Sequence, residues 1–179
     1  FGATDGIDLS NSYTLETLLN WNGALSEPSP QWHTQLKKNR PNAIIITDCV
    51  WSQSNKELDF FVSDVGVLSS LNDFKENDRI SMPGNTNARI KNGKIVSVNT
   101  ISLNHVIEKK FKFKSPSYIS IDTEGSEYEI LKVFDFKKFR PIVLTIEHNF
   151  TELQFKIDEL MKSNDYVRVF KKITAFDAW

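Results

Sequence analysis

Two acidic residues, Asp122 and Glu124, follow directly after a segment of alternating apolar residues at 118–121. A glycine, a serine and a helix-like apolar pattern come next, so this stretch predicts a strand, a turn and a helix. Ligands of open α/β sheets bind at the carboxyl ends of the strands, which places both acids at a candidate site. The alternative is a capped, solvated turn in which Ser126 is the helix N-cap and Glu129 completes a capping box.

A second polar set, Glu147, His148 and Asn149, follows the apolar run 141–146. The run predicts a buried strand, and its carboxyl end is expected at the same edge of the sheet as Asp122. A neutral imidazole titrates near neutral pH, which makes His148 a candidate general base together with Asp122. A histidine at a strand end is also often a structural hydrogen-bonding residue.

The start of the chain has features of a nucleotide-binding loop. Small residues at 2–6 precede a helix-like pattern at 13–21, and backbone N–H groups of such a loop can approach a polar or anionic ligand. Glu27 ends a short strand-like segment, and a carboxylate about 20 residues past a glycine loop is typical of ribose binding. Pro28 extends the backbone at Glu27. The glycine spacing is not GxGxxG, so a plain turn before a helix has the same pattern.

The run 43–51 is nearly continuous in β-branched residues and predicts a parallel strand that is covered on both faces. Asp48, Cys49 and Val50 lie at its end as candidates for contact with a base, where Asp48 would accept a hydrogen bond from an amino group. Cys49 is otherwise an inert packing residue.

Strand and helix patterns alternate along the chain, which predicts an α/β fold with a doubly wound, mostly parallel sheet. Turn residues and short strand-like runs interrupt this alternation at 52–99, and we expect an inserted β-hairpin region at 72–99 that is a lid or covers a sheet edge. The 179 residues fit one domain, 1–179. Because Phe1 resembles the end of a strand whose beginning is absent, we expect the natural protein to extend further at the N-terminus.

The composition argues against several classes of protein. The chain has 22 basic and 23 acidic residues and a net charge of −1, which favours neither a nucleic acid nor an anionic membrane as a partner. No apolar run approaches the roughly 20 residues that a membrane span needs. A single cysteine, Cys49, excludes an internal disulfide and fits a reducing compartment, so we expect a cytoplasmic protein. The sequence leaves the oligomeric state open.

Six blocks of the chain resemble the FkbM-type methyltransferases. They are the residues at 1–6, 8–11, 26–28, 121–127, 146–149 and 176–179. The Asp-Thr-Glu-Gly-Ser-Glu block is the most specific part of the resemblance, and the region 72–99 supports it least. The family uses S-adenosylmethionine on a Rossmann-like sheet of seven strands whose last strand is antiparallel. The resemblance therefore implies this fold and this cofactor.

The resemblance also implies a place for each part of the cofactor across the strand ends. The residues expected to bind it are Gly2, Ala3 and Thr4 near the methionine part, Glu27 at the ribose, Asp48, Cys49 and Val50 at the adenine, and Asp122 near the sulfonium or the acceptor. Asn11 and Pro28 are two further residues expected to bind the cofactor. The implied reaction is O-methylation of a hydroxyl on a small molecule or a carbohydrate. Asp122, His148 and Glu124 are the candidate catalytic residues.

A metal-assisted reaction and two other classes of function remain open. Asp122, Glu147 and Asn149 resemble the acid, acid and amide placement of magnesium-dependent catechol-type methyltransferases, and oxygen ligands of this kind suit Mg²⁺. An NAD-dependent oxidoreductase would also have a glycine loop and a ribose-binding acid. A non-catalytic Rossmann-like module would instead bind a partner through the region 72–99.

Overall fold

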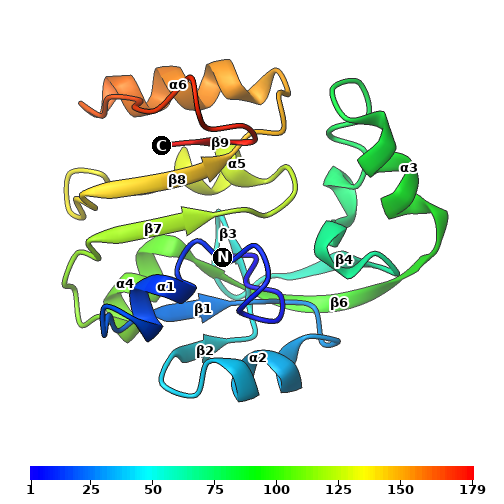
Figure 1. Ribbon diagram of the computed structural model, residues 1–179, viewed down its shortest axis with the longest axis horizontal. Coiled ribbons are helices and arrows are strands. Elements are labelled where there is room, and N and C mark those ends of the chain that lie inside the picture. Colours follow the sequence, from blue (N-terminus) through cyan, green and yellow to red (C-terminus); the bar gives the residue numbers. More distant parts are fainter.

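The computed structural model describes residues 1–179 (Figure 1). The strands are β1 (Ala24–Ser26), β2 (Ile44–Ile46), β3 (Cys49–Trp51), β4 (Glu57–Ser63), β5 (Ser70–Leu71), β6 (Gly93–Ser102), β7 (Tyr118–Ile121), β8 (Val143–Glu147) and β9 (Asp177–Ala178). The α-helices are α1 (Tyr13–Thr17), α2 (His33–Asn39), α3 (Pro83–Lys91), α4 (Leu103–Lys110), α5 (Glu127–Leu131) and α6 (Leu153–Ser163). Two short 3-10 helices, η1 (Gly66–Leu68) and η2 (Asn72–Phe74), lie between β4 and α3.

The strands form three small sheets, and the expected Rossmann-like, doubly wound sheet of seven mostly parallel strands is wrong. One sheet has the order β1-β2, a second β3-β6-β4-β5, and a third β7-β8-β9. Parallel pairing joins β1 to β2, β3 to β6 and β7 to β8, whereas β4, β5 and β9 pair antiparallel with their neighbours.

Two local features explain the division of the sheet. The N-terminal residues lie between β7 and β1, where the Phe1 amino group donates to the Ser120 carbonyl at 2.7 Å and the Ala3 N–H donates to the Ser26 carbonyl at 3.2 Å. With only these two hydrogen bonds, the N-terminal residues form no strand between β1 and β7. The two strands therefore belong to separate sheets. The long strand β6 pairs through 93–99 with β4 and through 100–102 with β3, which draws β3 into the antiparallel sheet.

Several single elements also differ from their expected form. The run 43–51, expected as one strand, forms two strands, β2 and β3. The expected hairpin at 72–99 is wrong in part, because α3 separates β6 from its antiparallel partner β4. The segment directly after β6 forms the helix α4.

The largest apolar core lies between β7 and β8 and the helices that pack against them. Alternating residues of β7 and neighbouring residues of β8 supply its centre, and α4, α5 and α6 cover it with Val106, Ile130 and Ile157. A smaller core surrounds Phe60 and Val98 in the β3-β6-β4-β5 sheet. Figure 1 shows α3 beyond the carboxyl ends of β7 and β8, on the side toward which both arrows point. No helix combines the length and the apolar character needed to cross a lipid bilayer.

Candidate functional site

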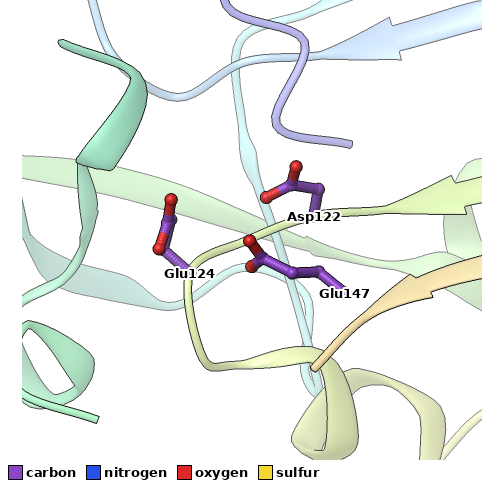
Figure 2. A group of neighbouring side chains, drawn as sticks. All are labelled: Asp122, Glu124 and Glu147. Atoms are coloured by element: carbon purple, nitrogen blue, oxygen red, sulfur yellow. The ribbon is translucent and has the colours of Figure 1, made fainter. Parts of the chain in front are cut away.

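The parallel pairing of β7 with β8 brings two acidic residues together. Ile121 lies opposite Ile146, so Asp122 and Glu147 are the next residues of neighbouring strands at the same edge. Glu124 joins them from the turn that follows β7 (Figure 2). One carboxylate oxygen from each of the three residues lies within 4.8 Å of the others.

The turn after β7 is held closed by Glu127, the first residue of α5. One of its carboxylate oxygens accepts from the backbone N–H groups of Thr123 at 2.7 Å and Gly125 at 3.2 Å, and from the Thr123 hydroxyl at 2.9 Å. The expected N-cap bond is absent, because the Ser126 hydroxyl donates to the Thr123 hydroxyl and not to the helix. Glu124 has a positive φ of 59° in this turn. The closed turn therefore carries Asp122 and Glu124 toward the same space.

Arg89 of α3 reaches Glu124 from the other side. Its side chain is fully buried, and its guanidinium forms ion pairs with Glu124 and, at 2.7 Å, with Asp78. The same group donates to the carbonyls of Leu68 at 2.7 Å and Lys75 at 3.1 Å. The segment between β4 and β6 is thus fixed against the turn after β7 by one arginine.

Burial raises the pKa of each clustered carboxyl group. Burial and the charge of Glu127 raise the pKa of Asp122 to about 7. Burial raises the pKa of Glu124 to about 8, although the Arg89 charge acts in the opposite direction. Burial and the neighbouring acids raise the pKa of Glu147 well above its usual value. Three carboxyl groups at one place with a single nearby guanidinium favour protonation or the binding of a cation.

A cavity of about 700 Å³ lies beside this acidic cluster. Of the residues expected from the sequence to bind a cofactor, those that line it are Gly2, Ala3, Thr4, Asn11, Glu27, Pro28, Cys49, Val50 and Asp122. Glu124, Glu147 and Asn149 line it as well. The cavity is therefore lined by residues of the N-terminal loop, of the segment directly after β1, of β3, and of the chain around the ends of β7 and β8.

Gly2 makes the close approach of the N-terminal loop to the cluster possible. Its φ of +70° is in the left-handed region, and a Cβ atom there would lie 1.7 Å from the carbonyl oxygen of Asp122. No other residue type fits this position without moving the backbone.

Glu27 links the N-terminal loop to the end of β1. It is 4% exposed, and its two carboxylate oxygens accept from the N–H groups of Thr4 at 2.8 Å and Ser29 at 2.7 Å. Burial raises the pKa of Glu27, and these two hydrogen bonds lower it. A carboxylate oxygen has two lone pairs, so both oxygens retain acceptor capacity toward a ligand.

Two of the expected residues do not line the cavity. Asp48 is half-buried, and its carbonyl accepts from the Ser26 hydroxyl at 2.9 Å. His148 is buried, with the Phe150 N–H donating to Nδ1 at 3.1 Å and the Arg168 guanidinium 2.9 Å from Nε2. Burial and the Arg168 charge lower the pKa of His148. These contacts suit a structural histidine, and its role as a base stays a prediction.

Cys49 lines the cavity as a buried thiol. Burial, with the charges of Glu27 and Asp48, raises the pKa of this thiol to about 12. A thiol that stays protonated near neutral pH is a poor nucleophile, which agrees with a packing role.

Sequence reasoning missed two buried arginines that support the walls of the cavity. Arg89 holds the segment that contributes Met82 and Asn85 to the lining. Arg40, at the end of α2, pairs with Glu16 at 2.6 Å and donates to the Gly6 carbonyl at 2.9 Å, which fixes the N-terminal wall. A single arginine has no diagnostic spacing, so neither had a signal in the sequence.

Comparison with known protein families identifies a match over most of the chain. Residues 1–168 match the model of the methyltransferase FkbM domain. No curated protein and no solved structure matched the chain.

Proposed function

The chain belongs to the FkbM methyltransferase family, and from this premise we propose that it transfers a methyl group from S-adenosylmethionine to a hydroxyl of a small molecule or a carbohydrate. The observation that carries this proposal is the cavity of about 700 Å³ in which the N-terminal loop, Glu27 and the acidic cluster meet. The family match favours neither an NAD-dependent oxidoreductase nor a non-catalytic binding module.

The residues of the cavity fit S-adenosylmethionine, which when bound supplies a methyl group on a positively charged sulfur. Gly2 leaves the N-terminal loop free of a side chain where it meets Asp122. Glu27 offers a buried carboxylate for the ribose hydroxyls, and Val50 offers an apolar surface for the adenine. The lining contains no lysine or arginine but contains several acids, which suits a cationic sulfonium. The acidic residues in the lining are Asp8, Glu27, Asp122, Glu124, Glu147 and Asp177.

Asp122 is the proposed general base among the candidate catalytic residues. It lines the cavity, whereas His148 does not. In the proposed step, Asp122 would accept the hydroxyl proton of the acceptor, and S-adenosylmethionine would supply the methyl group to the acceptor oxygen and leave as the neutral thioether. Alignment of the acceptor oxygen with the methyl group supplies most of the remaining rate enhancement. Glu124 is held by Arg89 of α3, and we propose that the acceptor binds where Met82 and Asn85 line the cavity.

Calorimetric titration with S-adenosylmethionine and S-adenosylhomocysteine tests the proposal. Glu27→Gln removes a charged hydrogen-bond acceptor, which typically costs about 1.5 to 3 kcal/mol, so the affinity should fall by about tenfold or more. Glu159→Gln, on the exposed face of α6, is the matched control and should bind as the unchanged protein does. Failure of the folded protein to bind either compound would refute the proposal, and so would unchanged binding by the Glu27 variant.

A further inference from the structure

We propose that Asp122, Glu124 and Glu147 form a site for one divalent cation, Mg²⁺ or Mn²⁺, beside the cavity. Figure 2 shows the three side chains converging from the end of β7, the turn after it and the end of β8. Their closest oxygens all lie within 4.8 Å of one another. Oxygens bound to one ion at about 2.1 to 2.5 Å are separated by at most about 4 to 5 Å, so a small cation could contact all three.

An unsatisfied atom of Glu147 is the independent observation for a ligand. Glu147 is 7% exposed, and its Oε2 is buried without any hydrogen-bond partner. Most buried polar atoms in native proteins have a partner, and leaving one without a partner is costly. Glu147 also lines the cavity together with Asp122 and Glu124. A cation at this point would give Oε2 the partner that the protein itself does not supply.

The basic side chains near the cluster do not neutralise all of its carboxylates. Arg89 is shared between Asp78 and Glu124, and no lysine or arginine lines the cavity. Asp122 and Glu147 therefore have no basic side chain as a partner, and the cation whose charge lowers the pKa of Asp122 is the Phe1 amino group. Glu127, the other acid nearby, is satisfied by the N–H groups of its own turn. One divalent ion would neutralise these two carboxylates, which have no basic side chain beside them.

The proposed set of ligands differs from the one expected from the sequence. Glu124 takes the place of Asn149, whose side-chain amide lies 3.4 Å from a Glu124 oxygen and donates to it. Asn149 and Arg89 would then orient Glu124 from outside the ion, as such partners commonly do in metal sites. A set of three carboxylates without histidine or cysteine favours Mg²⁺ or Mn²⁺ over Zn²⁺. His148 contributes nothing to this set, because its ring contacts Phe150 and Arg168.

A cation at this position would also assist the proposed methyl transfer. This chemical role rests on the proposed function, whereas the cation site itself does not. A cation beside the acceptor pocket can bind the acceptor hydroxyl and lower its pKa, which reduces the need for a strong base. The existence of the site depends only on the three carboxylates and can be tested without an acceptor or a cofactor.

Binding of Mn²⁺ to the chain, followed by electron paramagnetic resonance and calorimetry near neutral pH, tests the site. We expect one Mn²⁺ per chain, displaced by excess Mg²⁺, and a melting temperature that rises with Mn²⁺ concentration. Glu147→Gln should weaken Mn²⁺ binding by at least about tenfold and remove the rise in melting temperature. Glu159→Gln removes an acid from an exposed helical surface and should change neither result. Equal loss of Mn²⁺ binding in both variants would indicate non-specific attraction and overturn the proposal.

Two further measurements keep the result unambiguous. Melting curves without metal show whether the Glu147→Gln variant is folded. If it is not, the Glu124→Gln variant replaces it in the Mn²⁺-binding experiment. A folded, unchanged protein that binds no Mn²⁺, or a Glu147 variant that binds it as tightly, would overturn the proposal. Titration of the same samples with S-adenosylhomocysteine is a separate readout, so failure of the metal site and failure of the proposed function can be distinguished.

Discussion

Arg89 of α3 and Glu124 of the turn after β7 form a buried ion pair that joins segments 35 residues apart in the chain. The arginine is fully buried, and its other contacts are to Asp78 and to two carbonyl groups. This single side chain therefore connects the segment between β4 and β6 to the acidic cluster. The segment is part of the cavity wall and does not only cover a sheet edge.

Arg89→Met should destabilise the protein strongly. Removing one partner of a buried pair leaves Asp78 and Glu124 without their cation and typically costs about 3 to 5 kcal/mol. Arg79→Met is the matched control, because Arg79 pairs with Glu76 at the surface and such pairs contribute about 1 kcal/mol or less. Urea denaturation of both variants measures the two free energies of unfolding. A loss for Arg89→Met no greater than that of the control would show that the ion pair contributes little.

Gly2→Ala should reduce the affinity for S-adenosylhomocysteine without preventing folding. The added Cβ would lie 1.7 Å from the Asp122 carbonyl oxygen, and the residue has a positive φ, so the N-terminal loop must move away from the cluster. Gly23→Ala is the control, because a Cβ there meets no atom within 4 Å. We expect a loss of about tenfold or more at position 2, which corresponds to about 1.4 kcal/mol, and none at position 23. Equal affinities for the two variants would place the cofactor away from the loop.

Asp122→Asn should slow methyl transfer far more than His148→Ala. A general base typically contributes about 10²- to 10⁴-fold, and Asp122 lines the cavity whereas His148 is held by Phe150 and Arg168 outside it. Release of labelled methyl groups from S-adenosylmethionine to a hydroxylated acceptor measures both rates. If His148→Ala caused the larger loss while both variants bound S-adenosylhomocysteine normally, His148 would be the base and Asp122 would not.

The local elements of the site could be predicted from the sequence because their signals are local. The alternation at 118–121 and the apolar run before Glu147 correspond to β7 and β8, and the acids after them meet because parallel strands end at one edge. The residues expected at the N-terminal loop and at Glu27 line the same cavity. Periodicity and strand direction are properties of short segments, so a single sequence is sufficient to find them.

The arrangement of the sheets could not be predicted, because it depends on contacts between distant segments. β6 pairs with β4 along one part and with β3 along another, and nothing in its sequence indicates where the partner changes. Arg89 was expected in one of the short strand-like runs at 52–99. It lies instead in α3, where it forms ion pairs with Asp78 and Glu124. Ion pairs of this kind leave no periodic pattern in the chain.

The free energy of unfolding should fall as the pH rises through the range in which the clustered acids titrate. The usual pKa values are 3.8 for Asp122 and 4.5 for Glu124, and in the folded protein they rise to about 7 and about 8. Between these limits the folded protein holds protons that the unfolded chain has lost, so raising the pH favours unfolding. The contribution to stability is complete below the usual pKa values and is lost by about pH 8.

Chemical denaturation across this pH range, with the matched variants Asp122→Asn and Asp59→Asn, measures the effect. Asp122→Asn removes one of the titrating groups and should flatten the decline, whereas Asp59→Asn changes an exposed residue of β4 and should leave it unchanged. Mn²⁺ binds the deprotonated carboxylates, so its stabilising effect should grow as the pH rises and should oppose the decline. A stability curve that Asp122→Asn leaves unaltered would mean that Asp122 is ionised in the folded protein at all these pH values.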